Sequence, residues 1–206
     1  MSLDTVPIID ISPFLSGDPA GKKAVADAVA AACTDIGFFA ISGHGVDQHL
    51  VEDLREASHS FFEQPEPVKR ETVHPIPDTP RGLRVMEGES LGRTVRPDAT
   101  PDLKEFYHYG PQDWPDEPYF NGPEGKQYFI PNIWPDKPAS FREASLAYYA
   151  EMERLIHDLG RIASMALGLP ENWFEDKLDK HVTAIRLNYY PLLADGPPPG
   201  QIRAGE

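Results

Sequence analysis

Three polar side chains near the end of the 206-residue chain are spaced so that they could bind a small molecule together. Residues 181–191 read "HVTAIRLNYYP", a run rich in β-branched and aromatic residues that predicts a β-strand. Because side chains alternate between the faces of a strand, Arg186, Asn188 and Tyr190 share one face. A guanidinium, an amide and a phenol can all donate hydrogen bonds to a carboxylate-bearing molecule. Periodicity alone favours the other interpretation, a solvated outer face of an edge strand.

The opposite face of this strand indicates how it is held. That face carries Thr183, Ile185, Leu187 and Tyr189, which are apolar enough to pack against a long helix. Ser140 and Glu143 have the spacing of a capping box, and apolar residues at helical spacing follow them as far as Gly168. The sequence therefore predicts a long helix that precedes and supports the polar strand.

The rest of the chain predicts alternating strands and helices followed by loops. Asp18 is expected to cap a first helix that ends at Gly37, and Asp47 is expected to cap a second helix that ends before Pro65. We expect strands in "VPIIDI", "FFAISGHG" and "KEFYHYG", the last within the proline-rich residues 65–140. This order offers too few parallel strands for a doubly wound sheet. The patterns of apolar and turn residues alone do not identify a complete fold.

Composition excludes several classes of partner. The formal charge is −14 and no cluster of Lys and Arg extends beyond "VKR", which disfavours nucleic acid and anionic membranes. No apolar run approaches a membrane span, and the N-terminus does not resemble a signal peptide. The single cysteine, Cys33, cannot form an internal disulfide and falls in a helical apolar stripe, so we expect a buried structural thiol and a cytoplasmic location.

Recognisable metal and nucleotide motifs are absent from the sequence. A mononuclear iron(II) oxygenase needs two His and one carboxylate on one face, commonly beginning as His-x-Asp. None of the seven histidines is followed two residues later by Asp or Glu. The sequence also has no P-loop, no G-x-G-x-x-G and no C-x-x-C. We therefore assign no metal ligand within the 206 residues.

Several segments in order resemble a known family. "VPIIDIS", "ACTDIGFFAISGHGV", "LKEFYHYG", "NIWP" and "RLNYYP" resemble the N-terminal part of the iron(II)/2-oxoglutarate-dependent dioxygenases, in the isopenicillin N synthase-like branch. The resemblance implies an α+β fold, a double-stranded β-helix (jelly roll) with N-terminal helices, of which only the N-terminal portion is present. Residues 1–100 would form an N-terminal α/β region, and residues 101–206 the long helix and first core strands.

The resemblance also implies an activity and roles for residues. The protein would be an oxidoreductase that uses iron(II), 2-oxoglutarate and O₂ to oxidise a small organic substrate, releasing succinate and CO₂. Asn188 and Tyr190 would bind the 2-oxoglutarate cosubstrate, and Arg186 would face the prime substrate, which could be an anion. The iron ligands would follow Glu206, so a remainder of the same polypeptide is expected and the catalytic residues are unknown.

Two other functions remain open. The chain could be a truncated, non-catalytic paralogue that acts as a binding module, although an exposed half-built sheet is an aggregation hazard. It could also belong to an isopenicillin N synthase-type oxidase that does not use 2-oxoglutarate. The N-Y-Y-P arrangement disfavours that second alternative.

Overall fold

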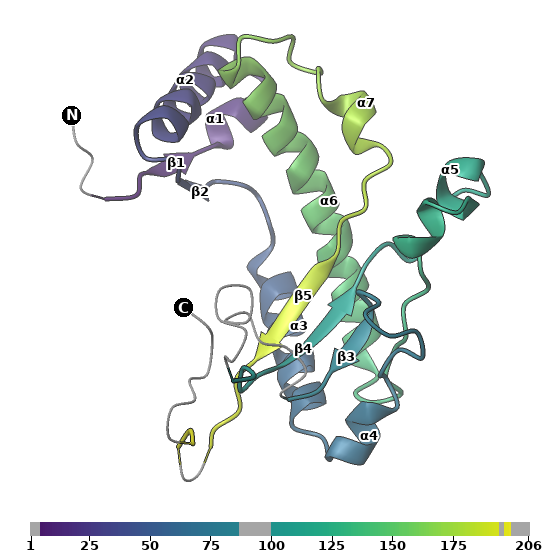
Figure 1. Cartoon of the computed structure of the whole chain (residues 1–206). Helices are drawn as coiled ribbons and strands as arrows, with labels where there is room; N and C mark the ends of the chain where they lie inside the picture. Colours follow the sequence, from purple (N-terminus) through teal and green to yellow (C-terminus); the bar gives the residue numbers. More distant parts are fainter. Residues whose placement is uncertain (1–4, 87–99, 194–195, 199–206) are drawn as a thin grey trace. The chain divides into compact units, whose positions relative to one another are not determined.

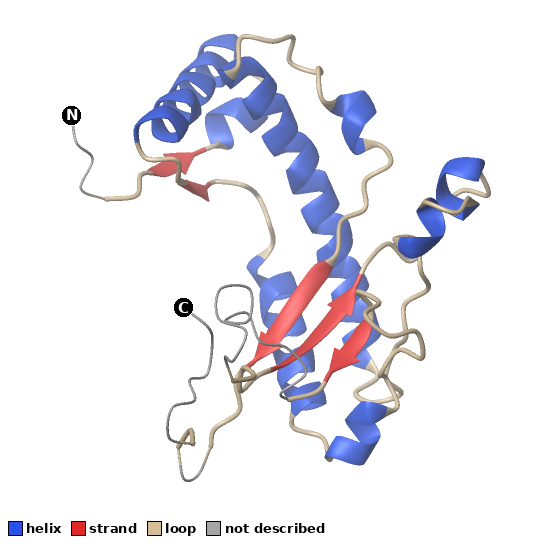
Figure 2. Cartoon of the chain, viewed as in Figure 1, coloured by secondary structure: helices blue, strands red, loops and turns tan. Residues whose placement is uncertain are grey.

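The computed structural model describes residues 5–86, 100–193 and 196–198, which contain helices and strands in one chain (Figures 1 and 2). The strands are β1 (Ile8–Asp10), β2 (Ala40–Ser42), β3 (Gly82–Arg84), β4 (Glu105–Tyr109) and β5 (Ile185–Tyr189). The α-helices are α1 (Ser12–Leu15), α2 (Pro19–Asp35), α3 (Gln48–Phe62), α4 (Glu66–Arg70), α5 (Pro118–Asn121), α6 (Ser140–Ala166) and α7 (Glu175–Leu178). A short 3₁₀ turn covers Gly125–Gln127. The strands and long helices expected from the sequence are confirmed.

One compact unit combines the chain up to Gln48 with Ala150–His181. Its strands β1 and β2 pair in parallel, with Ile9 opposite Ile41. Asp18 caps α2 by accepting a hydrogen bond from the Gly21 amide, as the sequence predicts. The helix ends before Gly37, which has a φ of 84°. Glycine adopts this angle readily, whereas a residue with a side chain would be strained there. Buried residues from these elements and from α6 form one core: Ile9, Ile11, Phe14, Val25, Val29, Ala32 and Ile162.

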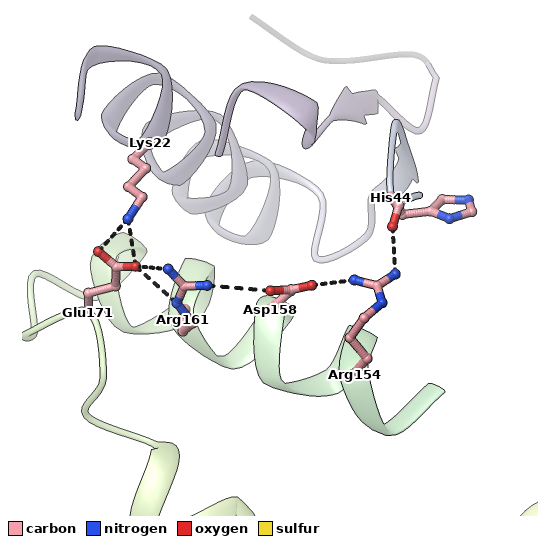
Figure 3. Close-up of polar contacts among 6 residues, drawn as sticks. All are labelled: Lys22, His44, Arg154, Asp158, Arg161 and Glu171. Carbon is pink, nitrogen blue, oxygen red and sulfur yellow. Dashed lines mark hydrogen bonds and ion pairs between the residues drawn. The ribbon is translucent and has the colours of Figure 1, made fainter. Parts of the chain in front are cut away.

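A chain of ion pairs crosses the surface of this first unit (Figure 3). Glu171 accepts hydrogen bonds from Lys22 on α2 and from Arg161 on α6. Asp158 lies between Arg161 and Arg154, and Arg154 donates to the His44 carbonyl at 2.9 Å. The network therefore ties α2 and the loop after β2 to the second half of α6.

A second compact unit combines residues 49–149 with the chain from Val182 onward. Its three strands form an antiparallel sheet in the order β3-β4-β5. Figure 2 shows this sheet lying over α3 and the first part of α6. The core between them is largely aromatic: Leu54, Ala57, Phe61, Phe62, Leu83, Tyr107, Tyr109, Phe141, Ala144 and Tyr149. Ile185, Leu187 and Tyr189 pack against this cluster, as the alternation along β5 predicts.

Cys33 corrects one expectation. Its thiol is free, as expected, but the residue is exposed rather than buried. Cys33 lies in the last turn of α2, where Ala32 beside it is buried. Helical spacing predicts which residues lie on the same face of a helix. It does not predict whether other parts of the protein cover that face along its full length.

Two other expectations concern organisation. The boundary near residue 100 stays a prediction, because residues 87–99 lie outside the described part of the chain. Three strands on two helices are an α+β arrangement, and the complete jelly roll remains an expectation.

Among the described helices, none combines the length and the apolar character that a bilayer crossing requires.

Candidate functional site

The register of the sheet gathers polar side chains on the face turned away from the aromatic core. In β4 and β5, Phe106 is opposite Asn188 and His108 is opposite Arg186. On the other side of β4, Arg84 of β3 is opposite Phe106. Residues directly opposite each other in an antiparallel pair project to the same face. We call these five residues the polar face.

Arg186 of β5 contacts two other residues of the polar face. Its guanidinium carbon is 3.6 Å from the centroid of the Phe106 ring. Its Nε donates a hydrogen bond of 2.8 Å to Oδ1 of Asn188, two residues along the strand. Both contacts restrict the position of the guanidinium. The sequence pattern that predicted a shared face for Arg186 and Asn188 is thus confirmed.

The contact with Arg186 also fixes the orientation of the Asn188 amide. An arginine side chain has only donors, so the Asn188 atom that faces it must be the carbonyl oxygen. The Nδ2 group of Asn188 then points elsewhere as a donor. Asn188 is exposed, and so it can present this donor to a molecule that lies on the polar face.

Tyr190 is placed differently from the other two predicted site residues. It follows the last residue of β5, and 41% of its surface is exposed. Whether Tyr190 shares a face with Arg186 and Asn188 therefore stays a prediction, because β5 ends at Tyr189. That the Asn188 amide and the Tyr190 hydroxyl together bind 2-oxoglutarate stays a prediction.

Sequence reasoning missed Arg84, Phe106 and His108 as members of the polar face. Phe106 is 4% exposed, and its ring also contacts the His108 ring edge-on at 5.2 Å. Arg84 contributes a second cation, which approaches Asp78 at 3.9 Å. Alternation within "KEFYHYG" could have separated Phe106 and His108 from the core-facing tyrosines. The pairing with β5, however, links residues about 80 positions apart and is not encoded in either strand alone.

The opposite face of the sheet keeps this arrangement in place. The Tyr189 ring is stacked on Phe62 of α3, with centroids 5.0 Å apart and planes within 4°. Tyr107 donates a hydrogen bond to the Ile133 carbonyl. Burial raises the pKa of the Tyr107 and Tyr109 hydroxyls above the ordinary value. These two phenols therefore stay neutral and support the sheet rather than exchange protons.

A groove of about 460 Å³ runs between α3 and β5, with Arg186 and Asn188 in its lining. Most of its wall is apolar or aromatic, including Leu54, Phe62 and Tyr189. The Ser58 hydroxyl, also in the lining, is buried without a hydrogen-bond partner in the described part of the chain. The groove provides apolar surface next to the strand that carries the polar residues.

The described residues do not fit an iron site. Within them, no group of three or more His, Cys, Asp or Glu side chains is close enough to hold a metal ion. His108 is the one residue of the polar face with a metal-binding side chain, and arginine and phenylalanine are not iron ligands. We therefore derive no chemical step through a metal from these residues.

Comparison with known proteins identifies relatives over nearly the whole chain. A family model described as "non-haem dioxygenase in morphine synthesis N-terminal" matches residues 6–137. The chain is 29% identical over 188 residues to a 2-oxoglutarate-Fe(II) type oxidoreductase, hxnY, of Emericella nidulans, covering 90% of this chain and 52% of that protein. It is 31% identical over 199 residues to isopenicillin N synthase of Streptomyces clavuligerus, covering 94% of this chain and 57% of that protein.

A solved structure agrees with these relatives. A full-length protein of Neurospora crassa, solved in complex with α-ketoglutarate, superimposes with a TM-score of 0.73 at 26% identity. That match covers 97% of this chain and 59% of the Neurospora chain. The same Neurospora protein has also been solved with α-ketoglutarate and thymine. The present chain spans about half the length of the curated relatives it matches.

Proposed function

Because the chain belongs to the non-haem dioxygenase family, we propose that it is part of an iron(II)- and 2-oxoglutarate-dependent dioxygenase that oxidises a small organic substrate. The reaction would consume O₂ and release succinate and CO₂. The three strands β3, β4 and β5 would contribute to a double-stranded β-helix. Among the residues that the structure describes, no group of three or more His, Cys, Asp or Glu could hold the iron.

The observation that supports this function most directly is the donor set on the polar face. Arg186 and Asn188 are hydrogen-bonded to each other and project from a sheet whose other face is anchored in an aromatic core. Such rigid placement lowers the entropy lost when a molecule is bound. The side chains that could bind acceptor oxygens thus lie on a firmly supported strand.

We assign separate roles to the predicted site residues. Asn188 Nδ2 and the Tyr190 hydroxyl would donate hydrogen bonds to 2-oxoglutarate. Arg186 would bind an accepting or anionic group of the prime substrate. Bound iron(II) would supply the activation of O₂. The residues of this chain would orient the two organic molecules and place the substrate carbon to be oxidised, which is the positioning contribution that proteins make in such reactions.

The test is an assay of succinate release by the protein that contains this chain. With iron(II), O₂ and 2-oxoglutarate supplied, succinate should form, and a prime substrate should stimulate its release. Omission of either iron(II) or 2-oxoglutarate should abolish the product. Absence of succinate under all these conditions, together with no binding of 2-oxoglutarate, would overturn the proposal.

The assay also separates the alternatives. Isopenicillin N synthase of Streptomyces clavuligerus is among the relatives, so an oxidase that needs no 2-oxoglutarate remains a second candidate. Such an oxidase would consume O₂ with iron(II) and substrate when 2-oxoglutarate is absent. A non-catalytic binding module would show neither oxygen consumption nor succinate release, and it would still bind a partner.

A further inference from the structure

One asparagine of the chain precedes a glycine, and this pair has a characteristic reactivity. Of the four asparagines in the sequence, only Asn121 is followed by glycine, while the others precede Ile133, Trp173 and Tyr189. In an Asn-Gly pair, the backbone nitrogen of the glycine can attack the side-chain carbonyl carbon of the asparagine. Because glycine has no side chain, this approach is unobstructed. Asn121 is exposed, and so water can reach it.

The fold requires the glycine of this pair. Asn121 is the last residue of the short helix α5, and Gly122 follows it as the C-terminal cap. A Cβ atom at position 122 would lie 2.5 Å from the Pro118 carbonyl oxygen, a backbone atom that cannot move aside without moving α5. A larger residue, which would slow the reaction, is therefore excluded by the close approach of Pro118.

Hydrogen bonds hold both reacting groups at the end of α5. The Gly122 N–H, whose nitrogen is the nucleophile, donates to the Pro118 carbonyl at 2.8 Å. The Asn121 Nδ2 group, which would leave as ammonia, donates to Oδ1 of Asp116 at 2.8 Å. Nε1 of Trp114 donates to Oδ1 of Asn121 at 3.4 Å. A carboxylate only accepts and an indole only donates, so these two contacts agree on the orientation of the amide.

These contacts oppose the reaction while α5 is intact. To react, the Gly122 nitrogen must lose its proton and turn toward Cγ of Asn121. In α5 its N–H is directed instead at the Pro118 carbonyl, and the amide is held by Asp116. The contacts must therefore open before the bond can form. A helix of four residues with an exposed end opens locally at a low cost in free energy.

We propose that Asn121 is a deamidation site that the Asp116 carboxylate keeps closed and that local unfolding of α5 opens. In the open state the Gly122 nitrogen bonds to Cγ of Asn121, the Cγ–Nδ2 bond breaks, and ammonia leaves with the proton from the nitrogen. Water then hydrolyses the cyclic imide to give aspartate or isoaspartate at position 121. The reaction consumes no reactant other than water and needs no enzyme.

The product does not return to the closed arrangement. A carboxylate in place of the Asn121 amide has no donor for Asp116, and two like charges at hydrogen-bonding distance repel each other. The isoaspartate form also adds a methylene group to the backbone, which moves the Gly122 N–H away from Pro118. Deamidation would therefore leave α5 open irreversibly, without cleavage of the chain.

Mass spectrometry of peptides from the protein that contains this chain measures the reaction. In mildly alkaline buffer, Asn121 should convert to aspartate and isoaspartate while the other asparagines stay intact as internal references. The conversion should be faster in protein unfolded by urea than in folded protein. Equal rates in the folded and unfolded protein would overturn the gating by α5. Absence of conversion in the unfolded protein would overturn the site itself.

Alanine variants test the contact that closes the site. Asp116→Ala should raise the rate in folded protein roughly 10-fold, equivalent to about 1.4 kcal/mol, which is within the range for one hydrogen bond. Asp113→Ala is the matched control, since Asp113 is also exposed and no hydrogen bond or ion pair joins it to Asn121 in the described part of the chain. The control should react at the wild-type rate. Equal rates in the two variants would contradict the role of Asp116.

An exchange of the two side chains separates this contact from general damage to the fold. Asn121→Asp imitates the product and should speed the hydrogen exchange of the Gly122 amide, as followed by NMR. The double variant Asn121→Asp/Asp116→Asn again pairs one amide with one carboxylate, with donor and acceptor exchanged, and should restore slow exchange. Exchange that stays as fast in the double variant as in Asn121→Asp would show that this hydrogen bond does not close the site.

Discussion

At the scale of single residues, Asn188 connects two proposed binding roles. Its Oδ1 atom accepts from Arg186, which leaves Nδ2 as the donor for a second molecule. Arg186 would contact the prime substrate and Asn188 the cosubstrate. Substitutions of Asn188 should consequently affect both affinities, whereas substitutions of Arg186 and Tyr190 should separate them.

Tyr190→Phe tests the cosubstrate role. Loss of one hydroxyl hydrogen bond should weaken 2-oxoglutarate binding by about 0.5–1.5 kcal/mol, or up to about 3 kcal/mol if the partner is charged. Tyr190 is partly exposed at the end of β5, and so the substitution should be tolerated without loss of stability. The measurement is the apparent affinity for 2-oxoglutarate. A wild-type value would place Tyr190 outside the cosubstrate site.

Arg186→Met tests the substrate role. Methionine roughly conserves the volume of the side chain but removes its charge and its donors. The KM for the prime substrate should rise about 10- to 150-fold, which corresponds to about 1.5–3 kcal/mol for a charge-assisted contact. Succinate release without prime substrate should persist. If both activities fell equally, Arg186 would be a cosubstrate or structural residue.

At the scale of elements, a buried ion pair connects α4 to β4. Lys69 and Glu105 form it, and each side chain is only 8% exposed. Glu105 lies on the opposite face of β4 from its neighbour Phe106, so the pair lies behind the polar face. The position of β4 therefore depends partly on this ion pair as well as on apolar packing. Because Phe106 is on β4, the position of its ring depends on the ion pair too.

Lys69→Met should destabilise the fold strongly. Removal of one partner leaves a buried carboxylate without compensation, which typically costs about 3–5 kcal/mol, whereas the double variant Lys69→Met/Glu105→Leu should regain most of this loss. The free energy of unfolding in urea measures both. Arg70→Met is the matched control, because the neighbouring Arg70–Glu66 pair is exposed and should contribute about 1 kcal/mol or less. Equal losses in the single and double variants would argue against the ion pair.

The network in the first unit makes a different, pH-dependent contribution. Hydrogen bonds from Lys22 and Arg161 hold the pKa of Glu171 below its ordinary value of 4.5. A depressed pKa in the folded state stabilises the protein above the ordinary value, and the contribution is lost as the pH falls through the folded-state pKa. Glu171→Gln should therefore destabilise the protein at neutral pH and reduce the difference in stability between neutral and acidic pH.

Urea unfolding at neutral pH and at a pH well below 4.5 would measure the Glu171 effect. Asp27→Asn is a suitable control, since Asp27 forms an exposed ion pair with Lys23 on α2 alone. That control should change the pH dependence little. An unaltered pH dependence in Glu171→Gln would mean that the carboxylate has no net preference for the folded state.

At the scale of the whole molecule, the two compact units are each built from separate stretches of sequence. One joins the N-terminal strands and α2 to the second half of α6, and the other joins α3, the loops and β4 to β5. Each unit therefore depends on contacts between residues far apart in the chain. Such non-local contacts form slowly and are difficult to infer from local patterns.

Iron binding provides a prediction at the same scale. The 206-residue chain should not bind iron(II), or manganese(II) as its surrogate, with stoichiometry and high affinity, because no three ligands converge in its described residues. Calorimetric titration of the chain would measure this. A tight stoichiometric site would contradict this prediction.

The sequence by itself determined the local structure of this protein and the identity of one row of candidate site residues. Capping at Asp18, the stop at Gly37, the long helix and the alternation along β5 are all local, because a helix repeats every 3.6 residues and a strand every two. The order of several segments also indicated the family. Tertiary structure alone decided that Phe106 lies under Arg186, that Asn188 turns its oxygen to that arginine, and that Cys33 is exposed. The register between distant strands depends on the packing of the whole chain, and so does the burial of a helix face. Neither can be predicted from the periodicity of one segment.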